Sequence, residues 1–167
     1  MFVLFFIIAP NFKVRAQVSG DYSIQANIIY HFTKYIDWPK NNKEGDFIIG
    51  VVGDSPLYDE LKKMMNNKSA GNQRIVVKHS TSSQADYDCH ILFIAEDQSG
   101  TIKRIAAKTA GTPVLLVSEE EGMATKGACI NFIVEADRLK LEINKNNIEQ
   151  RHLNIASELL HLGRIVY

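Results

Sequence analysis

The chain has few cysteines, no excess of charge of either sign and no long apolar run. Two cysteines, Cys89 and Cys129, are too few for a disulfide scaffold. Lys and Arg number 19, as do Asp and Glu, so the net charge is zero and no basic stripe points to nucleic acid. No segment reaches the ~20 apolar residues that cross a bilayer, so we expect no membrane span.

Sequence motifs for metals, cofactors and catalysis are also missing. The five histidines are scattered, and His-x-x-x-His, Cys-x-x-Cys, Gly-x-Gly-x-x-Gly and the P-loop pattern are absent. One catalytic-looking string is present, Gly53-Asp54-Ser55-Pro56-Leu57, where a GDSL-type hydrolase places its serine, with Glu149 and His152 as imaginable partners. Ser-Pro is typical of a helix start and no oxyanion segments follow, so we expect Ser55 to be a cap. We therefore predict a non-enzyme without cofactor or metal and keep the hydrolase as a weaker alternative.

The N-terminus has the pattern of a leader. An apolar run over residues 1–9 is followed by Val14-Arg15-Ala16, which predicts a signal peptide at 1–16, cleaved after Ala16. No Lys or Arg precedes the run, and a buried N-terminal strand is the alternative. Because Gln17 and not Cys follows the cleavage point, no lipid anchor is indicated. We expect residues 17–167 to form an exported, periplasmic domain.

Apolar residues make up 46% of the 167 residues, enough to build the core of one domain. Continuous apolar runs alternate with helical patterns, which predicts a single-domain α/β fold with a largely parallel sheet flanked by helices. Period-two patterns on both sides of Ala136-Asp137 predict a C-terminal antiparallel hairpin. The predicted strands are 47–52, 74–78, 90–95 and 113–118, and the predicted helices are 21–37 behind an Asp21 cap, one from 55, 101–110 and one from about 154 to 163 with Ile155, Leu159 and Leu162 on one face.

Four aromatic residues lie in or just after the first predicted helix. Helical spacing assigns Phe32 and Tyr35 to the core, whereas Tyr30 and Trp38 lie off that face. Large aromatic side chains outside a core are suitable anchors for a partner protein. We predict that Tyr30 and Trp38 contact a partner; local packing against the domain's own loops is the alternative for both.

Several strings, none specific alone, together resemble the YfiR-like family in order and spacing, from about residue 21 to the end. They are Ile29–Pro39, Val51–Asp54, Cys89–Ile94, Pro113–Ser118, Ile130–Glu135, Leu141–Asn144 and Ala156–Val166. The resemblance implies a periplasmic α/β domain that tends to dimerise. It also implies a regulator in cyclic-di-GMP signalling that restrains a membrane-bound diguanylate cyclase by binding its periplasmic part; a sensor kinase is another possible inner-membrane target.

The family resemblance also implies redox sensitivity through disulfides. Cys89 matches a family cysteine, but Gly50 stands where its partner aligns, and Cys129 matches no disulfide position. We treat Cys89 and Cys129 as candidate redox residues and expect both to be reduced. A small-ligand sensor is the competing function, with a crevice expected at the carboxyl ends of the parallel strands, near Gly53-Asp54, Ala95-Glu96 and Ser118-Glu119.

Overall fold

The computed structural model describes residues 22–81 and 87–167; the predicted signal peptide and the Asp21 cap lie outside them. The helices are α1 (Tyr22–Tyr35), α2 (Leu57–Met65), α3 (Ile102–Lys108), α4 (Lys145–Glu149) and α5 (Ser157–Leu160), with short 3-10 helices η1 (Lys40–Asn42), η2 (Glu96–Thr101) and η3 (Met123–Lys126). The strands are β1 (Ile36–Asp37), β2 (Phe47–Val52), β3 (Ser69–Ala70), β4 (Gln73–Ser80), β5 (Ile91–Ile94), β6 (Leu115–Ser118), β7 (Ile130–Glu135), β8 (Arg138–Asn144), β9 (Asn154–Ile155) and β10 (Gly163–Val166).

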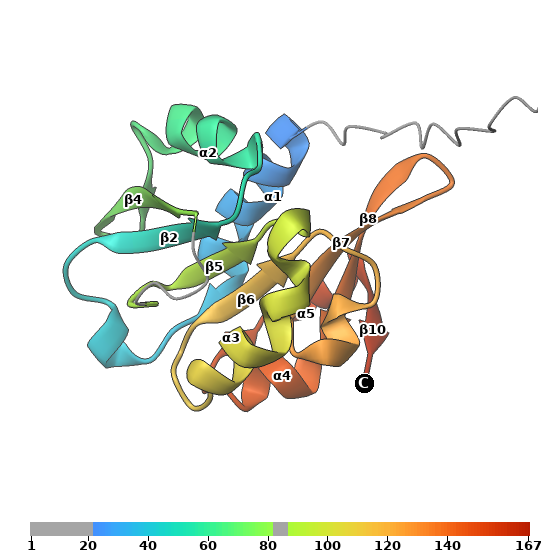
Figure 1. Ribbon diagram of the computed structural model, residues 1–167. Helices are drawn as coiled ribbons and strands as arrows, with labels where there is room; N and C mark the ends of the chain where they lie inside the picture. Colours follow the sequence, from blue (N-terminus) through green and yellow to red (C-terminus); the bar gives the residue numbers. More distant parts are fainter. Residues whose placement is uncertain (1–21, 82–86) are drawn as a thin grey trace, which may run out of the picture.

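One mostly parallel sheet organises the chain. Its eight strands follow the order β10-β8-β7-β6-β5-β2-β4-β3, and β4, β2, β5, β6 and β7 run parallel (Figure 1). β8 is antiparallel to β7, as the period-two patterns predict. The turn between them contains Ala136 and Asp137, both with positive φ, as two-residue hairpin turns require. The predicted single-domain α/β fold with a C-terminal hairpin is confirmed.

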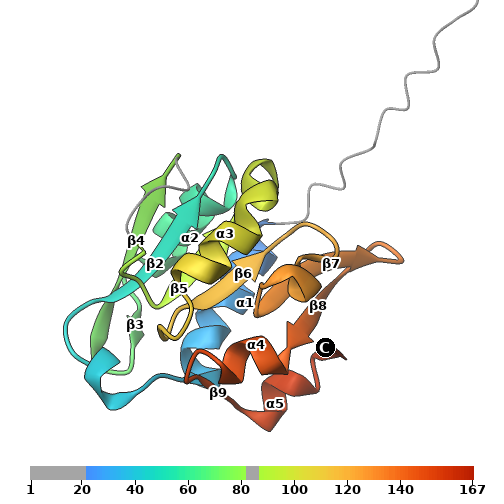
Figure 2. The same cartoon turned by 60° about the horizontal axis from the view of Figure 1, so that its bottom comes forward.

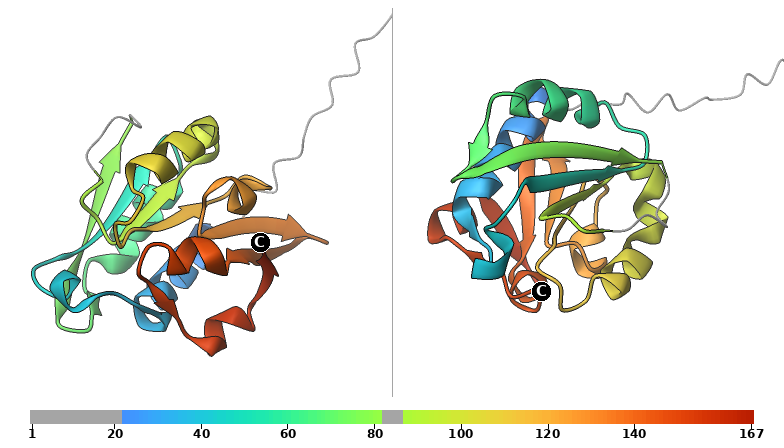
Figure 3. Two further views of the ribbon diagram at one scale, coloured as in Figure 1. Left: turned by 90° about the horizontal axis from the view of Figure 1, so that it is seen from below. Right: turned by 90° about the vertical axis from the view of Figure 1, so that its left-hand side faces the viewer.

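Helices cover both faces of the sheet. α1 and α2 lie on one face and α3 on the other (Figure 3). The Phe32 ring of α1 stacks on Phe132 of β7, with 6.3 Å between the ring centroids. On the opposite face, the Arg151 guanidinium donates hydrogen bonds to the Thr109 and Ala106 carbonyls at the end of α3. Because the central strands are covered on both faces, they are apolar at nearly every position.

The structure differs from the prediction at the end of the first helix and over the last predicted helix. α1 stops at Tyr35, and the next two residues form β1, which pairs antiparallel with β9. The predicted last helix from about residue 154 is wrong: only Ser157–Leu160 are helical, and the Leu162 side chain is 65% exposed. The residues on either side of this short helix form strands instead, β9 before it and β10 after it (Figure 2). In both places a strand partner far along the chain overrides a local helical spacing.

Ser55 caps α2. Its Oγ accepts a hydrogen bond from the Leu57 N–H at 3.3 Å, and its carbonyl accepts one from the Tyr58 N–H at 3.1 Å. Both bonds satisfy backbone donors that have no partner within the helix. We expect Ser55→Ala to lower the free energy of unfolding by about 1 kcal/mol, measured by urea denaturation. An unchanged unfolding midpoint would contradict a capping role.

Candidate functional site

Trp38 belongs to the core, and the prediction that it lies outside is wrong. Its side chain is 5% exposed. The indole Nε1–H donates to the Pro113 carbonyl at 3.0 Å, and the ring meets Phe47 edge to face with centroids 5.0 Å apart. Helical spacing misplaced Trp38 because the helix has already ended at Tyr35. The side chain packs within its own domain and offers a partner almost no free surface.

Tyr30 of α1 is half-buried and packs against the core, as Tyr35 does, so burial does not separate the residue predicted off the core face from the one predicted on it. Two ammonium groups cover its ring: the Lys34 Nζ is 4.7 Å from the ring centroid and the Lys68 Nζ is 4.3 Å away. Tyr35, expected in the core with Phe32, is only half-buried and stacks on His31. Tyr30 therefore marks a surface that is both aromatic and positively charged.

A hollow of about 600 Å³ opens beside Lys34, the residue whose ammonium group also contacts the Tyr30 ring. It lies at the amino ends of β2 and β4, because Phe47 and Gln73, the first residues of these strands, line it. Three aromatic side chains contribute to its wall, Tyr35, Trp38 and Phe47. The volume is in the range of protein sites for small molecules or for single side chains of a partner.

At the opposite edge of the sheet, where a ligand crevice was expected, acidic side chains accept hydrogen bonds from backbone N–H groups. The Asp54 N–H donates to the Asp97 carboxylate at 3.1 Å, and the Glu96 N–H donates to the Glu119 carboxylate at 3.2 Å. Gly53 is in tight contact with this network, since a Cβ there would lie 2.2 Å from the Asp97 Oδ1. The hollow and the expected crevice are therefore at opposite ends of the sheet.

Glu119 is the most perturbed carboxyl group at this edge. Burial raises the pKa of Glu119 to about 7, and the nearby charges of Glu96 and Asp97 add to the increase. The hydrogen bond from the Glu96 N–H acts in the other direction, since it favours the ionised carboxylate. The protonation of Glu119 therefore changes near neutral pH.

The residues of the hydrolase alternative are not brought together. Ser55 follows β2 at the carboxyl edge of the sheet, whereas His152 follows α4, which begins where the antiparallel β8 ends at the amino edge. Within residues 22–81 and 87–167, no three His, Cys, Asp or Glu side chains are grouped so that they could hold a metal ion. No helix in the same ranges has the length and apolarity to cross a membrane.

Cys89 and Cys129 are not joined by a disulfide. β6 lies between their strands, so about two strand spacings, ~10 Å, separate them. A disulfide needs Cα atoms within about 7 Å, so the two cannot pair without a rearrangement of the backbone. Burial raises the pKa of the Cys129 thiol to about 11, although Arg151 beside it acts in the opposite direction. Cys129 is inert by these criteria, whereas Cys89 is partly exposed.

Comparison with known proteins gives the family. A family model described as YfiR/HmsC-like matches residues 22–164, which is nearly the whole chain. The chain belongs to the YfiR/HmsC-like family. A comparison with curated proteins finds no match. The structure thus carries a YfiR/HmsC-like fold, with its hollow beside Lys34 and its acidic cluster at the far edge.

Gly50 of β2 lies beside Cys89. β2 and β5 are neighbours, and a Cβ built on Gly50 would lie 3.6 Å from the Cys89 Sγ. We expect Gly50→Cys to form a disulfide with Cys89, because only the end of the Leu92 side chain must move to admit the new Cβ. Alkylation under denaturing, non-reducing conditions should label one thiol in the variant and two in the wild type. Three labelled thiols in the variant would contradict the expected pairing.

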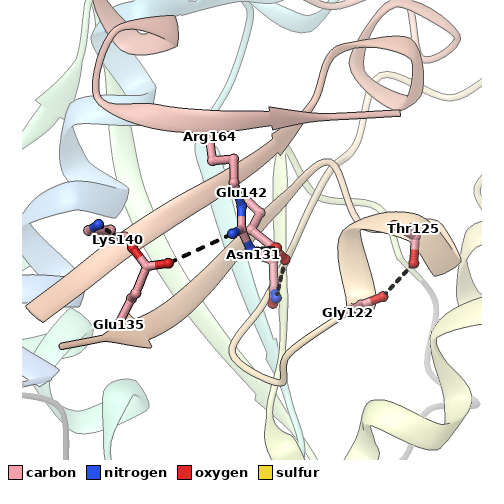
Figure 4. Close-up of polar contacts among 7 residues, drawn as sticks. All are labelled: Gly122, Thr125, Asn131, Glu135, Lys140, Glu142 and Arg164. Atoms are coloured by element: carbon pink, nitrogen blue, oxygen red, sulfur yellow. Dashed lines mark hydrogen bonds and ion pairs between the residues drawn. The ribbon is translucent and has the colours of Figure 1, made fainter. Parts of the chain in front are cut away.

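A ladder of polar side chains crosses β7, β8 and β10, and the sequence analysis did not single it out (Figure 4). The Asn131 Nδ2 donates to the Glu142 carboxylate at 3.2 Å, and Arg164 donates to the same carboxylate at 2.5 Å. Arg164 also lies 3.8 Å from Glu135. Glu142 is buried although it is on the polar side of its strand's pattern. Its pairing with Arg164 holds the edge strand β10 in register.

Proposed function

We propose that this protein is an exported periplasmic regulator that restrains a membrane-bound signalling enzyme by protein–protein contact. The observation that carries the proposal is the YfiR/HmsC-like match over residues 22–164. A diguanylate cyclase is the target that this family implies, with a sensor kinase as the other candidate. Restraint of such an enzyme needs a binding surface on the regulator and no reacting groups.

The arrangement of side chains supports binding more than chemistry. The serine and histidine of the hydrolase alternative lie at opposite edges of the sheet. Tyr30 remains partly accessible and carries positive charge around its ring, which suits a contact with another protein. Trp38 supports this region from within by forming part of the wall of the hollow.

Affinity isolation from solubilised membranes tests the regulatory function. We expect the wild type to enrich an inner-membrane cyclase or kinase, and Tyr30→Ala to enrich it less. Tyr167→Ala is the matched control, because Tyr167 is 85% exposed and lies at the chain's end. Without enrichment of a signalling enzyme by the wild type, the regulator proposal fails. Equal enrichment by a folded Tyr30→Ala removes only the role of Tyr30.

Export and dimerisation are separate parts of the proposal. The protein from a periplasmic extract should have the intact mass of a chain that starts at Gln17, the residue after the predicted cleavage point. Sedimentation equilibrium of this mature form should give twice the monomer mass at micromolar concentration. A product that retains Met1 contradicts export with cleavage. A monomer mass at every protein concentration measured contradicts dimerisation.

The small-ligand sensor makes a different prediction for the hollow of about 600 Å³. A sensor should leave the periplasm with a small molecule bound, or gain thermal stability when one is added. Native mass spectrometry of the freshly isolated protein measures the first, and a thermal-shift screen of amino acids and nucleotides measures the second. A native mass equal to that of the protein alone, together with no change in melting temperature in the screen, would favour the regulator over the sensor.

A further inference from the structure

The surface around Tyr30 and the hollow are continuous. Lys34 both contacts the Tyr30 ring and lines the hollow. Lys68 is the other cation on the ring, and Ala70 and Gly71, two and three residues after it, also line the hollow. We call Tyr30, Lys34, Lys68 and this hollow the docking face. Lys34 therefore connects the two cations on the Tyr30 ring to the hollow.

The two cations of the docking face have no carboxylate partner in the part of the chain that the structure describes. Other surface cations do have one: Lys43 pairs with Asp37 at 2.6 Å and Arg74 with Asp46 at 2.8 Å. The Lys34 and Lys68 ammonium groups lie within about 9 Å of each other, the sum of their distances to the Tyr30 centroid. At the upper end of that range the separation exceeds the Debye length of ~8 Å at physiological ionic strength, so their repulsion is largely screened there and becomes stronger at low salt.

An anion placed near Tyr30 would relieve this repulsion and interact with both ammonium groups. Hydrogen bonds between a carboxylate and an ammonium group are stronger than neutral ones. The ring already orients the two side chains, which lowers the entropy they lose when an anion binds. The hollow next to them has the half-buried Tyr35 and Ile155 in its lining, and an apolar side chain of a partner can pack against these two residues. The docking face therefore combines two cations with a hollow of mixed polar and apolar lining, in which Asp37 is paired with Lys43.

We propose that the docking face binds an acidic segment of the membrane partner, with carboxylates paired to Lys34 and Lys68 and one large apolar side chain in the hollow. This inference rests on the proposed regulatory function. A second copy of the chain fits poorly, because a two-fold contact would bring the same two cations against each other. A lipid surface fits poorly as well, since a flat bilayer does not fill a concave hollow beside the charges.

Site-specific photo-crosslinking in cells tests which molecule occupies the docking face. A photoreactive residue in place of Asn72, an exposed residue that lines the hollow, should crosslink to a membrane protein. Mass spectrometry of the crosslinked peptide should show at least two Asp or Glu residues next to a large apolar residue. The same replacement at the exposed Asn146 of α4 is the control and should give no such peptide.

Charge removal tests the role of the two lysines. We expect Lys34→Ala/Lys68→Ala to reduce the Asn72 crosslink at least tenfold at low salt, and less at high salt, where screening already weakens the pairing. Lys103→Ala/Lys126→Ala removes two exposed lysines elsewhere and should leave the yield unchanged. Thermal melts of both variants confirm folding.

Several outcomes overturn the inference. They are a crosslink to a neutral or basic segment, to a second copy, to lipid or to a small molecule, and also no crosslink at all. An unchanged yield in folded Lys34→Ala/Lys68→Ala overturns it too. If affinity isolation still enriches a signalling enzyme, the regulatory function stands and only the docking face is wrong. If isolation fails as well, the regulatory function falls with it.

Discussion

Trp38→Ala is expected to lower the free energy of unfolding by about 3–5 kcal/mol, as truncation of a buried tryptophan usually does. The variant loses the edge-to-face contact with Phe47 and the hydrogen bond to the Pro113 carbonyl, and it leaves a cavity behind. Urea denaturation followed by circular dichroism measures the loss. Tyr30→Ala is the control and should cost far less, because the Tyr30 side chain is only half-buried.

The comparison of these two variants separates folding from binding. If Trp38→Ala and Tyr30→Ala cost equally little, Trp38 is not part of the core and its burial is contradicted. If Trp38→Ala unfolds, its failure to bind a partner carries no information about the interface. Tyr30→Ala, Lys34→Ala and Lys68→Ala are therefore the variants in which binding should be measured.

Glu119→Gln is expected to remove a pH dependence of stability of up to about 3 kcal/mol between pH 5 and pH 8. The pKa of Glu119 is about 7 in the folded protein and 4.5 ordinarily, so the folded state holds this proton more tightly than the unfolded state. The wild type therefore loses stability as pH rises from about 4.5, where Glu119 ionises in the unfolded chain, to about 7, where it also ionises in the folded protein. Glutamine stays neutral and avoids this loss.

Urea midpoints of wild type and variant at several pH values measure this effect. The difference in stability should be small at pH 5, grow in favour of Glu119→Gln up to about pH 7 and then level off. Glu158→Gln, at an exposed position, controls for the removal of a surface charge and should not change with pH in this way. Parallel curves for wild type and Glu119→Gln would show that burial does not perturb Glu119.

The sequence by itself determined most of the secondary structure of the sheet. The runs that became β2, β5 and β6 are apolar at almost every position because both faces of the sheet are covered, and this pattern is visible without a structure. The hairpin at Ala136-Asp137 follows from a period of two, and the helix start at Ser55-Pro56 follows from local hydrogen-bonding preferences. The family strings also depend only on local order and spacing.

Only the tertiary structure decided where the helices end and which short strands pair. β1 pairs with β9 more than a hundred residues later, and β10 pairs with β8, so the helical spacings around Ile36 and Ile155 were overridden. Trp38 became a core residue for the same reason, since its environment includes Phe47 and Pro113 from distant parts of the chain. Local periodicity carries no information about such partners.

The candidate site also depended on the tertiary structure. Helical spacing did not separate Tyr30 from Tyr35, and the contact of Tyr30 with Lys68 comes from the chain after α2. The hollow forms where the end of α1, the β1–β9 pair and the start of β4 meet, and each contributes a few lining residues. Pockets and charged surfaces form where segments that are distant in the sequence pack together. Local sequence patterns carry no information about that packing.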